Sequence, residues 1–191
     1  TGASPRSAAR SLFNMKGPLI GPEMVALIGY EDALWALYFI IPAYSSNSLP
    51  TIFKGGPPID GGRIFLDGRR IFGPSKTLRG LLGGLLGGSL FGLLESALLG
   101  WGLLPFALLV SAGSLLGDLL GSFIKRRLGL PPGSPAPLLD QLDFVLGGLA
   151  LSCPLYGLPL GSIAILLAIT PPIHLLANLL AYRAGLKDRP W

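Results

Sequence analysis

Long hydrophobic runs alternate with shorter polar segments along most of the chain. A run of ~20 apolar residues is long enough for a helix to cross the hydrocarbon core of a bilayer. The pattern predicts about five such helices, at residues 24–43, 81–99, 106–124, 142–156 and 162–182. Glu31 and Asp32 interrupt the first, and the fourth is short and could be tilted or incomplete. We therefore expect an all-α integral membrane protein with a single transmembrane domain over residues 15–191.

Two long polar loops separate the predicted helices. The first, at about residues 44–79, is rich in Gly, Pro and Ser, and the second covers about residues 125–141. Residues 1–14 begin without Met and lack the apolar centre of a signal peptide. We expect that segment to be an appended sequence or a disordered extension.

Lys and Arg residues concentrate in the two loops and in the C-terminal tail. The positive-inside rule places such segments in the cytoplasm. The turns near Gly100 and Gly157 carry no Lys or Arg, as expected on the opposite side. The pattern predicts an external N-terminus, which Arg6, Arg10 and Lys16 oppose, and a cytoplasmic C-terminus.

The composition supports a membrane protein. Half of the residues are hydrophobic and 13% are charged, against roughly a quarter charged in soluble domains. We expect no large additional soluble domain within these 191 residues. The net charge of +5 indicates membrane orientation rather than nucleic-acid binding, because the cations lie in a few loops. A single cysteine, Cys153, excludes a disulfide framework within the chain.

Glycines recur at four-residue spacing in the second predicted helix, at Gly80, Gly84, Gly88 and Gly92. Small residues at this spacing let another membrane helix approach closely. We therefore interpret them as a packing face rather than as a phosphate-binding loop.

Charged residues inside or beside apolar runs are the candidate chemistry. Asp118, Ser122 and Lys125 share one helix stripe, and Asp140 and Asp143 share a stripe on the next helix. A carboxylate within a membrane span is costly and usually faces a polar site or a partner. Asp118 could instead form a salt bridge, and Asp140 could instead start a helix. The three acids together favour Mg²⁺, which prefers oxygen ligands.

Cations beside these acids could bind phosphate. Lys125 and Arg126 follow the Asp118 stripe, whereas we expect Arg127 to act only as an interfacial stop signal. The first loop adds Arg69, Arg70, Lys76, Thr77 and Arg79. Attraction to lipid headgroups explains these loop cations as well as substrate binding does.

His174 lies after Pro171 and Pro172 in the last predicted helix, one turn before Asn178. A kinked helix with an internal hydrogen bond accounts for this pair.

The motifs Gly117-Asp118, Ser122, Lys125-Arg126 and LDQLD at residues 139–143 resemble the CDP-diacylglycerol synthase superfamily. From about Met24 onward the chain resembles the archaeal branch, through the loop segments IPAYSSNSLP, GPPIDGG and DGRRIFGPSKTLRG. The resemblance implies transfer of a cytidylyl group from CTP to 2,3-di-O-geranylgeranylglycerol 1-phosphate, giving CDP-archaeol and pyrophosphate.

The resemblance also implies a catalytic set of Asp118, Ser122, Lys125, Arg126, Asp140 and Asp143. In this hypothesis the three aspartates hold Mg²⁺, and the first-loop residues bind substrate. Bacterial and eukaryotic members carry Lys-Asp and Gly-His-Gly-Gly elements after the Lys-Arg pair, but this chain has LGLPPGSPAPL there. Functional roles that the bacterial and eukaryotic members assign to those two elements therefore cannot be assigned to residues of this chain.

The expected partners are CTP, an ether-lipid phosphate and membrane lipids, with no nucleic acid, and a homodimer is left open. The active site should face the cytoplasm, where CTP enters from water. A small transporter or flippase for an anionic lipid or phosphate is the alternative. No inverted repeat is visible, and the charges gather at helix ends rather than at the midplane.

Overall fold

The computed structural model describes residues 29–53 and 55–190. These residues form five α-helices and two 3₁₀ helices: α2 (Tyr30–Ser48), η2 (Leu49–Thr51), α3 (Leu78–Leu99), η3 (Trp101–Leu103), α4 (Leu104–Arg127), α5 (Leu139–Tyr156) and α6 (Leu160–Arg183). The described part contains no β-strand beyond two isolated bridges. The prediction of an all-α protein is confirmed, and the predicted extension at residues 1–14 lies outside the described residues.

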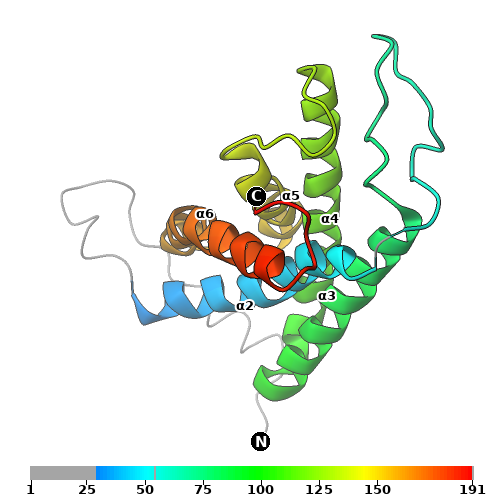
Figure 1. Cartoon of the computed structure of the whole chain (residues 1–191). Helices are drawn as coiled ribbons and strands as arrows, with labels where there is room; N and C mark the ends of the chain where they lie inside the picture. The colour runs from blue at the N-terminus through cyan, green and yellow to red at the C-terminus, as the bar shows by residue number, and fades with distance from the viewer. Residues whose placement is uncertain (1–28, 54, 191) are drawn as a thin grey trace, which may run out of the picture.

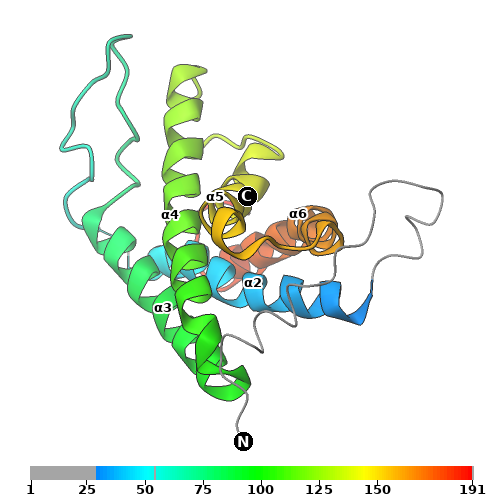
Figure 2. The ribbon, with the colours of Figure 1, turned by 180° about the vertical axis from the view of Figure 1, so that it is seen from behind.

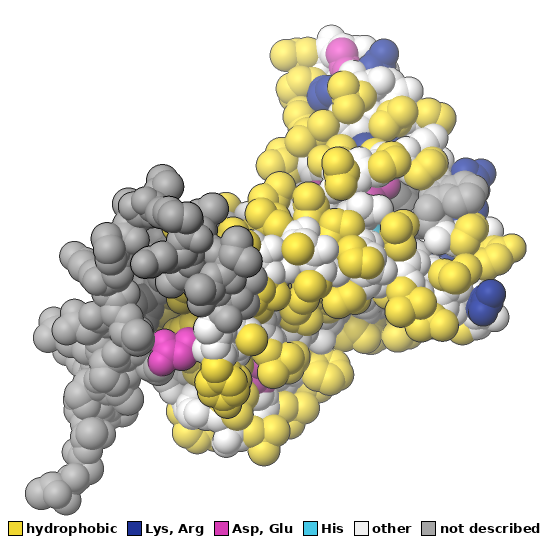
Figure 3. All heavy atoms as spheres, turned by 90° about the vertical axis from the view of Figure 1, so that its left-hand side faces the viewer, with side chains coloured by type: hydrophobic (Ala, Val, Ile, Leu, Met, Phe, Trp, Pro, Cys, Tyr) yellow, Lys and Arg dark blue, Asp and Glu magenta, His cyan; other side chains and the backbone are white. Residues whose placement is uncertain are grey.

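Three described helical segments are long and apolar enough to cross a membrane: Leu78–Leu99, Trp101–Arg127 and Leu160–Arg183. α2 and α5 do not meet that standard, and both carry acidic side chains in their first turns. The predicted number of five helices is confirmed, whereas three of the described helical segments, rather than about five, are candidate membrane spans. Figure 3 shows hydrophobic side chains covering much of one face, as expected for a surface in contact with lipid.

The helix ends differ from the predicted ones by a few residues. α3 begins at Leu78 instead of position 81, and α5 begins at Leu139 instead of position 142, so the second loop ends before the predicted position 141. α2 continues through Pro42 to Ser48, so the first loop begins later than the predicted position 44. α4 extends to Arg127, which places Lys125, Arg126 and Arg127 in its last turn. Cations there interact favourably with the negative end of the helix dipole.

The glycine face of α3 packs as predicted. Gly84 lies against the backbone of Ser46, Gly88 against the side chains of Ser46 and Ser111, and Gly92 against Ala107. A Cβ atom at any of these three positions would overlap its neighbour. The glycines therefore allow α3 to contact both α2 and α4 closely.

The core lies among α2, α4, α5 and α6. Phe39, Phe106, Phe144, Val145 and Leu166 are fully or almost fully buried there. Both ribbon views show α3 and α4 crossing, with the first loop extending beside the C-terminal end of α4 (Figures 1 and 2). The C-terminal tail ends near the start of α5. The first loop thus lies beside the C-terminal end of α4, and the tail lies beside the second loop and the start of α5.

Candidate functional site

An ion pair joins the first loop to α4. The Nζ atom of Lys76 donates hydrogen bonds of 2.6 and 2.5 Å to the two carboxylate oxygens of Asp118. Thr77 fixes the position of Lys76, because its hydroxyl accepts a 3.1 Å hydrogen bond from Gly80 N and so caps α3. The sequence analysis left open that Asp118 forms a salt bridge instead of acting in catalysis. The salt bridge is present, and its partner is Lys76 of the first loop.

A second glycine face brings α4 against α5. Gly117 lies against the backbone of Asp143 and Gly147, and Gly121 lies against the Asp143 side chain. A Cβ atom at Gly117 or Gly121 would overlap Asp143. The glycine spacing in α4 is the same as in α3, but its partner helix could not be read from the sequence.

Asp143 is brought close to Asp118 by this contact. Its exposed fraction is 9%, and the negative charge of Asp118 acts on it directly. Its Oδ1 atom accepts a 2.7 Å hydrogen bond from Phe144 N. Two carboxylates from neighbouring helices therefore converge beside Lys76.

Asp140 has different partners. Its Oδ1 atom accepts a 2.5 Å hydrogen bond from Lys125 Nζ, and its Oδ2 atom accepts one of 2.8 Å from Ala136 N, just before α5. Both oxygens thus hold the second loop and the end of α4 together. Asp140 thus lies in the first turn of α5, as the helix-start alternative expected, but the N-cap residue is Leu138.

Ser122 and Arg126 are buried beside this cluster, with exposed fractions of 5% and 7%. Arg126 donates a 3.3 Å hydrogen bond to the carbonyl oxygen of Pro131, and the charge of Asp140 acts on it. All six residues of the predicted catalytic set therefore come from the C-terminal half of α4 and the first turns of α5.

The donor set fits one magnesium ion held by two carboxylates. Mg²⁺ commonly binds through one or two carboxylates together with substrate phosphates, and Asp118 and Asp143 provide such a pair. No cluster of three or more His, Cys, Asp or Glu side chains suited to a metal occurs among the described residues. The three-carboxylate arrangement with Asp140 is therefore not assembled in this conformation.

Asp60 organises the first loop. Its side chain accepts a 2.6 Å hydrogen bond from Arg70 and further hydrogen bonds from the backbone N–H groups of Gly62, Phe72 and Gly73. Burial alone would raise the pKa of Asp60, but these donors hold that pKa well below its usual range. Arg70, a predicted substrate-binding residue, is thus a structural partner of Asp60 here.

Arg69 and Arg127 fasten this loop to α4. Arg69 Nη1 donates a 2.6 Å hydrogen bond to the carbonyl oxygen of Arg127 at the helix end. Arg127 pairs with Asp67 at 2.9 Å and stacks over the rings of Phe65 and Phe123. Arg127 therefore does more than end a membrane helix, and only the tertiary contacts reveal it.

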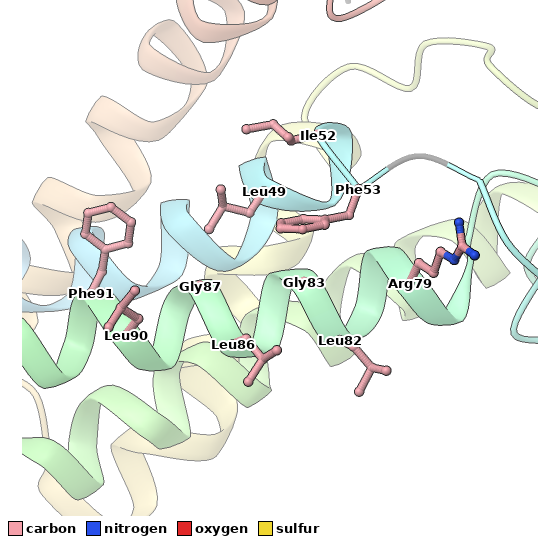
Figure 4. Close-up of a pocket in the computed structure, with 10 residues that line it drawn as sticks. All are labelled: Leu49, Ile52, Phe53, Arg79, Leu82, Gly83, Leu86, Gly87, Leu90 and Phe91. Carbon is pink, nitrogen blue, oxygen red and sulfur yellow. The ribbon is translucent and has the colours of Figure 1, made fainter.

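Arg79, the remaining loop cation among the predicted substrate-binding residues, lines an apolar groove of about 700 Å³ beside α3. Figure 4 shows Arg79 at one end of this groove and Phe91 at the other. Leu49 and Phe53 lie opposite Gly87 and Gly83. Arg79 thus lies in the first turn of α3, beside this groove, rather than in the first loop.

Three residues of α6 and the tail lie next to the cluster. His174 Nδ1 is 3.3 Å from Asn178 Nδ2, which agrees with the predicted internal hydrogen bond. Lys187 Nζ donates a 2.5 Å hydrogen bond to Asn178 Oδ1. Sequence reasoning assigned no site role to Lys187, because a lysine in a C-terminal tail resembles a topology signal.

Comparison with known proteins gives a consistent result. The family model described as CarS-like, CDP-archaeol synthase, matches residues 24–191. The chain is 48% identical over 168 residues to the CDP-archaeol synthase of Thermococcus onnurineus, covering 84% of this chain and 98% of that protein. It is 43% identical over 175 residues to the CDP-archaeol synthase of Methanocaldococcus jannaschii. That match covers 85% of this chain and 99% of the relative.

A solved structure is also similar. It is described as an intramembrane enzyme for archaeal membrane lipids biosynthesis, and it superposes with a TM-score of 0.70 at 42% identity. The match covers 76% of this chain and 93% of that one. The fold, the helix-end cluster and these relatives lead to one conclusion. The chain belongs to the CDP-archaeol synthase family of cytidylyltransferases, which act in archaeal membrane lipid biosynthesis.

Proposed function

We propose that the protein transfers a cytidylyl group from CTP to 2,3-di-O-geranylgeranylglycerol 1-phosphate at the cluster of Asp118, Asp143, Lys76 and Lys125. Family membership supports the reaction. The observation that carries the assignment of the site is the convergence of Asp118 and Asp143 across the glycine contact of α4 and α5.

In this reaction an oxygen of the lipid phosphate attacks the α-phosphorus of CTP. A new phosphorus–oxygen bond forms, the bond from the α-phosphorus to the bridging oxygen breaks, and pyrophosphate leaves with the electron pair. The nucleophile is already an anion, so no side chain has to remove a proton. The protein therefore contributes positioning and charge neutralisation.

Asp118 and Asp143 would hold Mg²⁺, and Asp140 stays a predicted third ligand. When bound, the ion would neutralise charge on the triphosphate of CTP. If Asp118 bound the metal instead of Lys76, the ammonium group of Lys76 would be free to bind a phosphate oxygen of the substrate. In this proposal Lys76 would then bind substrate, the role that the sequence analysis expected for it.

Lys125 and Arg126 act from the last turn of α4. Lys125 is held by Asp140, which keeps its ammonium group at the site before CTP arrives. Arg126 is buried, and burial strengthens its attraction to an anion because solvent screening is weaker. Ser122 offers a hydroxyl to a phosphate oxygen on the same helix face.

The site would face the cytoplasm, with the C-terminus on that side and the N-terminus outside. The clustering of cations around the two loops and the tail supports this orientation. CTP would then enter from water, and the lipid would reach the site laterally from the membrane.

The test uses purified protein in detergent with CTP labelled in its α-phosphate. We expect a lipid-soluble labelled product with the ether-lipid phosphate, less product with phosphatidic acid, and none after chelation of Mg²⁺. Absence of product from both lipids, with the protein folded and Mg²⁺ present, would refute the proposal. Transport of lipid without any effect of CTP would favour the flippase alternative.

A further inference from the structure

The tail after α6 folds back along that helix. Gly185 takes a left-handed conformation with φ of 72°, and the N–H groups of Leu186 and Lys187 both donate to the carbonyl oxygen of Ala181. This is a glycine-terminated helix end. It returns the chain toward Asn178 and fixes the direction in which Lys187 leaves the helix.

A second contact ties the tail to the loop between α4 and α5. Arg189 Nη1 donates a 3.3 Å hydrogen bond to the carbonyl oxygen of Gly133. The tail therefore bridges α6 and the loop that precedes Asp140. Its position next to the cluster results from contacts at two separate points.

Lys187 differs from the other lysines of the cluster in its partner. Lys76 and Lys125 are paired with the carboxylates of Asp118 and Asp140. The partner of Lys187 is the amide oxygen of Asn178, which carries no net charge. An amide fixes the position of an ammonium group without neutralising it.

The charges of the cluster act on Lys187. Burial lowers the pKa of Lys187 below its usual value, the charge of Lys76 lowers it further, and Asp140 and Asp118 oppose this. With Asp118, Asp140 and Asp143 all counted as charged, Lys76, Lys125, Lys187 and Arg126 still leave one positive charge in excess in a partly buried place. Such an arrangement is unfavourable alone and favours binding of an anion.

We propose that the C-terminal tail completes the triphosphate site, with Lys187 as a third lysine that contacts the β- or γ-phosphate of CTP. Asn178 positions its ammonium group, and Arg189 holds the tail against the second loop. This role rests on the proposed function, because it requires CTP as the substrate.

The test compares binding of CTP and CMP to purified protein in the presence of Mg²⁺, by titration calorimetry. For Lys187→Met we expect the Kd for CTP to rise at least about tenfold, since a hydrogen bond between charged groups is lost. The Kd for CMP should stay unchanged because CMP lacks the β- and γ-phosphates. Lys187→Arg should recover part of the affinity for CTP.

The matched control is Arg183→Met, which removes an exposed cation from the last turn of α6 and should leave both affinities unchanged. Unaltered CTP binding by Lys187→Met would overturn the proposal. An equal loss of CTP and CMP binding with a lower Tm would also overturn it, because the tail would then be only structural. Failure of the unsubstituted protein to bind CTP would count against the proposed function instead.

Discussion

Asp118, Asp140 and Asp143 carry the same functional group in three different environments. Asp118 is paired with Lys76, Asp140 holds Lys125 and the second loop, and Asp143 is buried against glycines of α4. A fourth aspartate, Asp60, is surrounded by hydrogen-bond donors in the first loop. The surroundings of each carboxylate, rather than its residue type, indicate what it contributes.

Asp60 provides a prediction on pH. Its lowered pKa means that it adds stability above the ordinary carboxyl pKa of about 4, and that this stability is lost as pH falls through the lower folded-state pKa. We expect pepsin to cleave the first loop slowly at about pH 4 and faster as the pH approaches ~2. Asp60→Asn should be cleaved fast at both values.

Asp188→Asn is the matched control for Asp60→Asn, since Asp188 is an exposed carboxylate of the tail. Gel analysis of the cleavage products gives the rates. Equal cleavage of Asp60→Asn and the unsubstituted protein across this range would show that Asp60 does not stabilise the loop.

At this scale, acids within apolar runs could be found from the sequence because their position is costly. The partners of these residues could not. Lys76 and Asp118 are far apart in the sequence, as are Asp67 and Arg127. Only the fold decides which of many cations meets which acid, and so Lys187 was assigned no site role.

At the scale of elements, two glycine faces determine how the helices meet. Gly84, Gly88 and Gly92 bring α3 against α2 and α4, and Gly117 and Gly121 bring α4 against α5. The first face was predicted as a packing surface from its spacing. The second face, on α4, has the same spacing. Its link to the site depends on its contact with Asp143 of α5, and the sequence alone does not show that α5 packs against this face.

Gly117→Ala tests the second face. Its Cβ atom would overlap the backbone of Asp143, and overpacking of this kind costs about 1–3 kcal/mol. We expect a lower Tm in detergent and a large loss of turnover, because α5 must move and carry Asp143 away from Asp118. Thermal unfolding and the CTP-to-lipid assay measure the two effects.

Gly102→Ala is the control for this substitution, since nothing lies within 4 Å of a Cβ atom there. It should behave like the unsubstituted protein. A Gly117→Ala variant with normal Tm and turnover would contradict the proposed role of the α4–α5 contact.

At the scale of the whole molecule, the first loop is hydrogen-bonded to the end of α4, and the tail is hydrogen-bonded to the second loop (Figure 1). The class of fold could be predicted from hydrophobic run length alone. The depth of α2 and α5 in the membrane could not, because their acidic first turns reduce their hydropathy. Their path depends on helix packing, which a single-sequence pattern does not contain.

Cysteine labelling tests the proposed orientation. In a Cys153→Ala background, single cysteines at Ser134, Asp188 and Gly102 are treated with a membrane-impermeant maleimide in intact cells. We expect Gly102→Cys to react at once, and the other two to react only after permeabilisation. Labelling of Ser134→Cys or Asp188→Cys in intact cells would reverse the proposed orientation.

The most direct test of the site is the rate of CDP-lipid formation by Asp143→Asn over a range of Mg²⁺ concentrations. Our account predicts that turnover falls at least about 100-fold and that the remaining activity needs more Mg²⁺ than the unsubstituted protein does. Asp188→Asn should retain both the rate and the Mg²⁺ dependence. Full turnover by Asp143→Asn with an unchanged Mg²⁺ dependence would contradict the assignment of Asp118 and Asp143 as the carboxylates of the reaction.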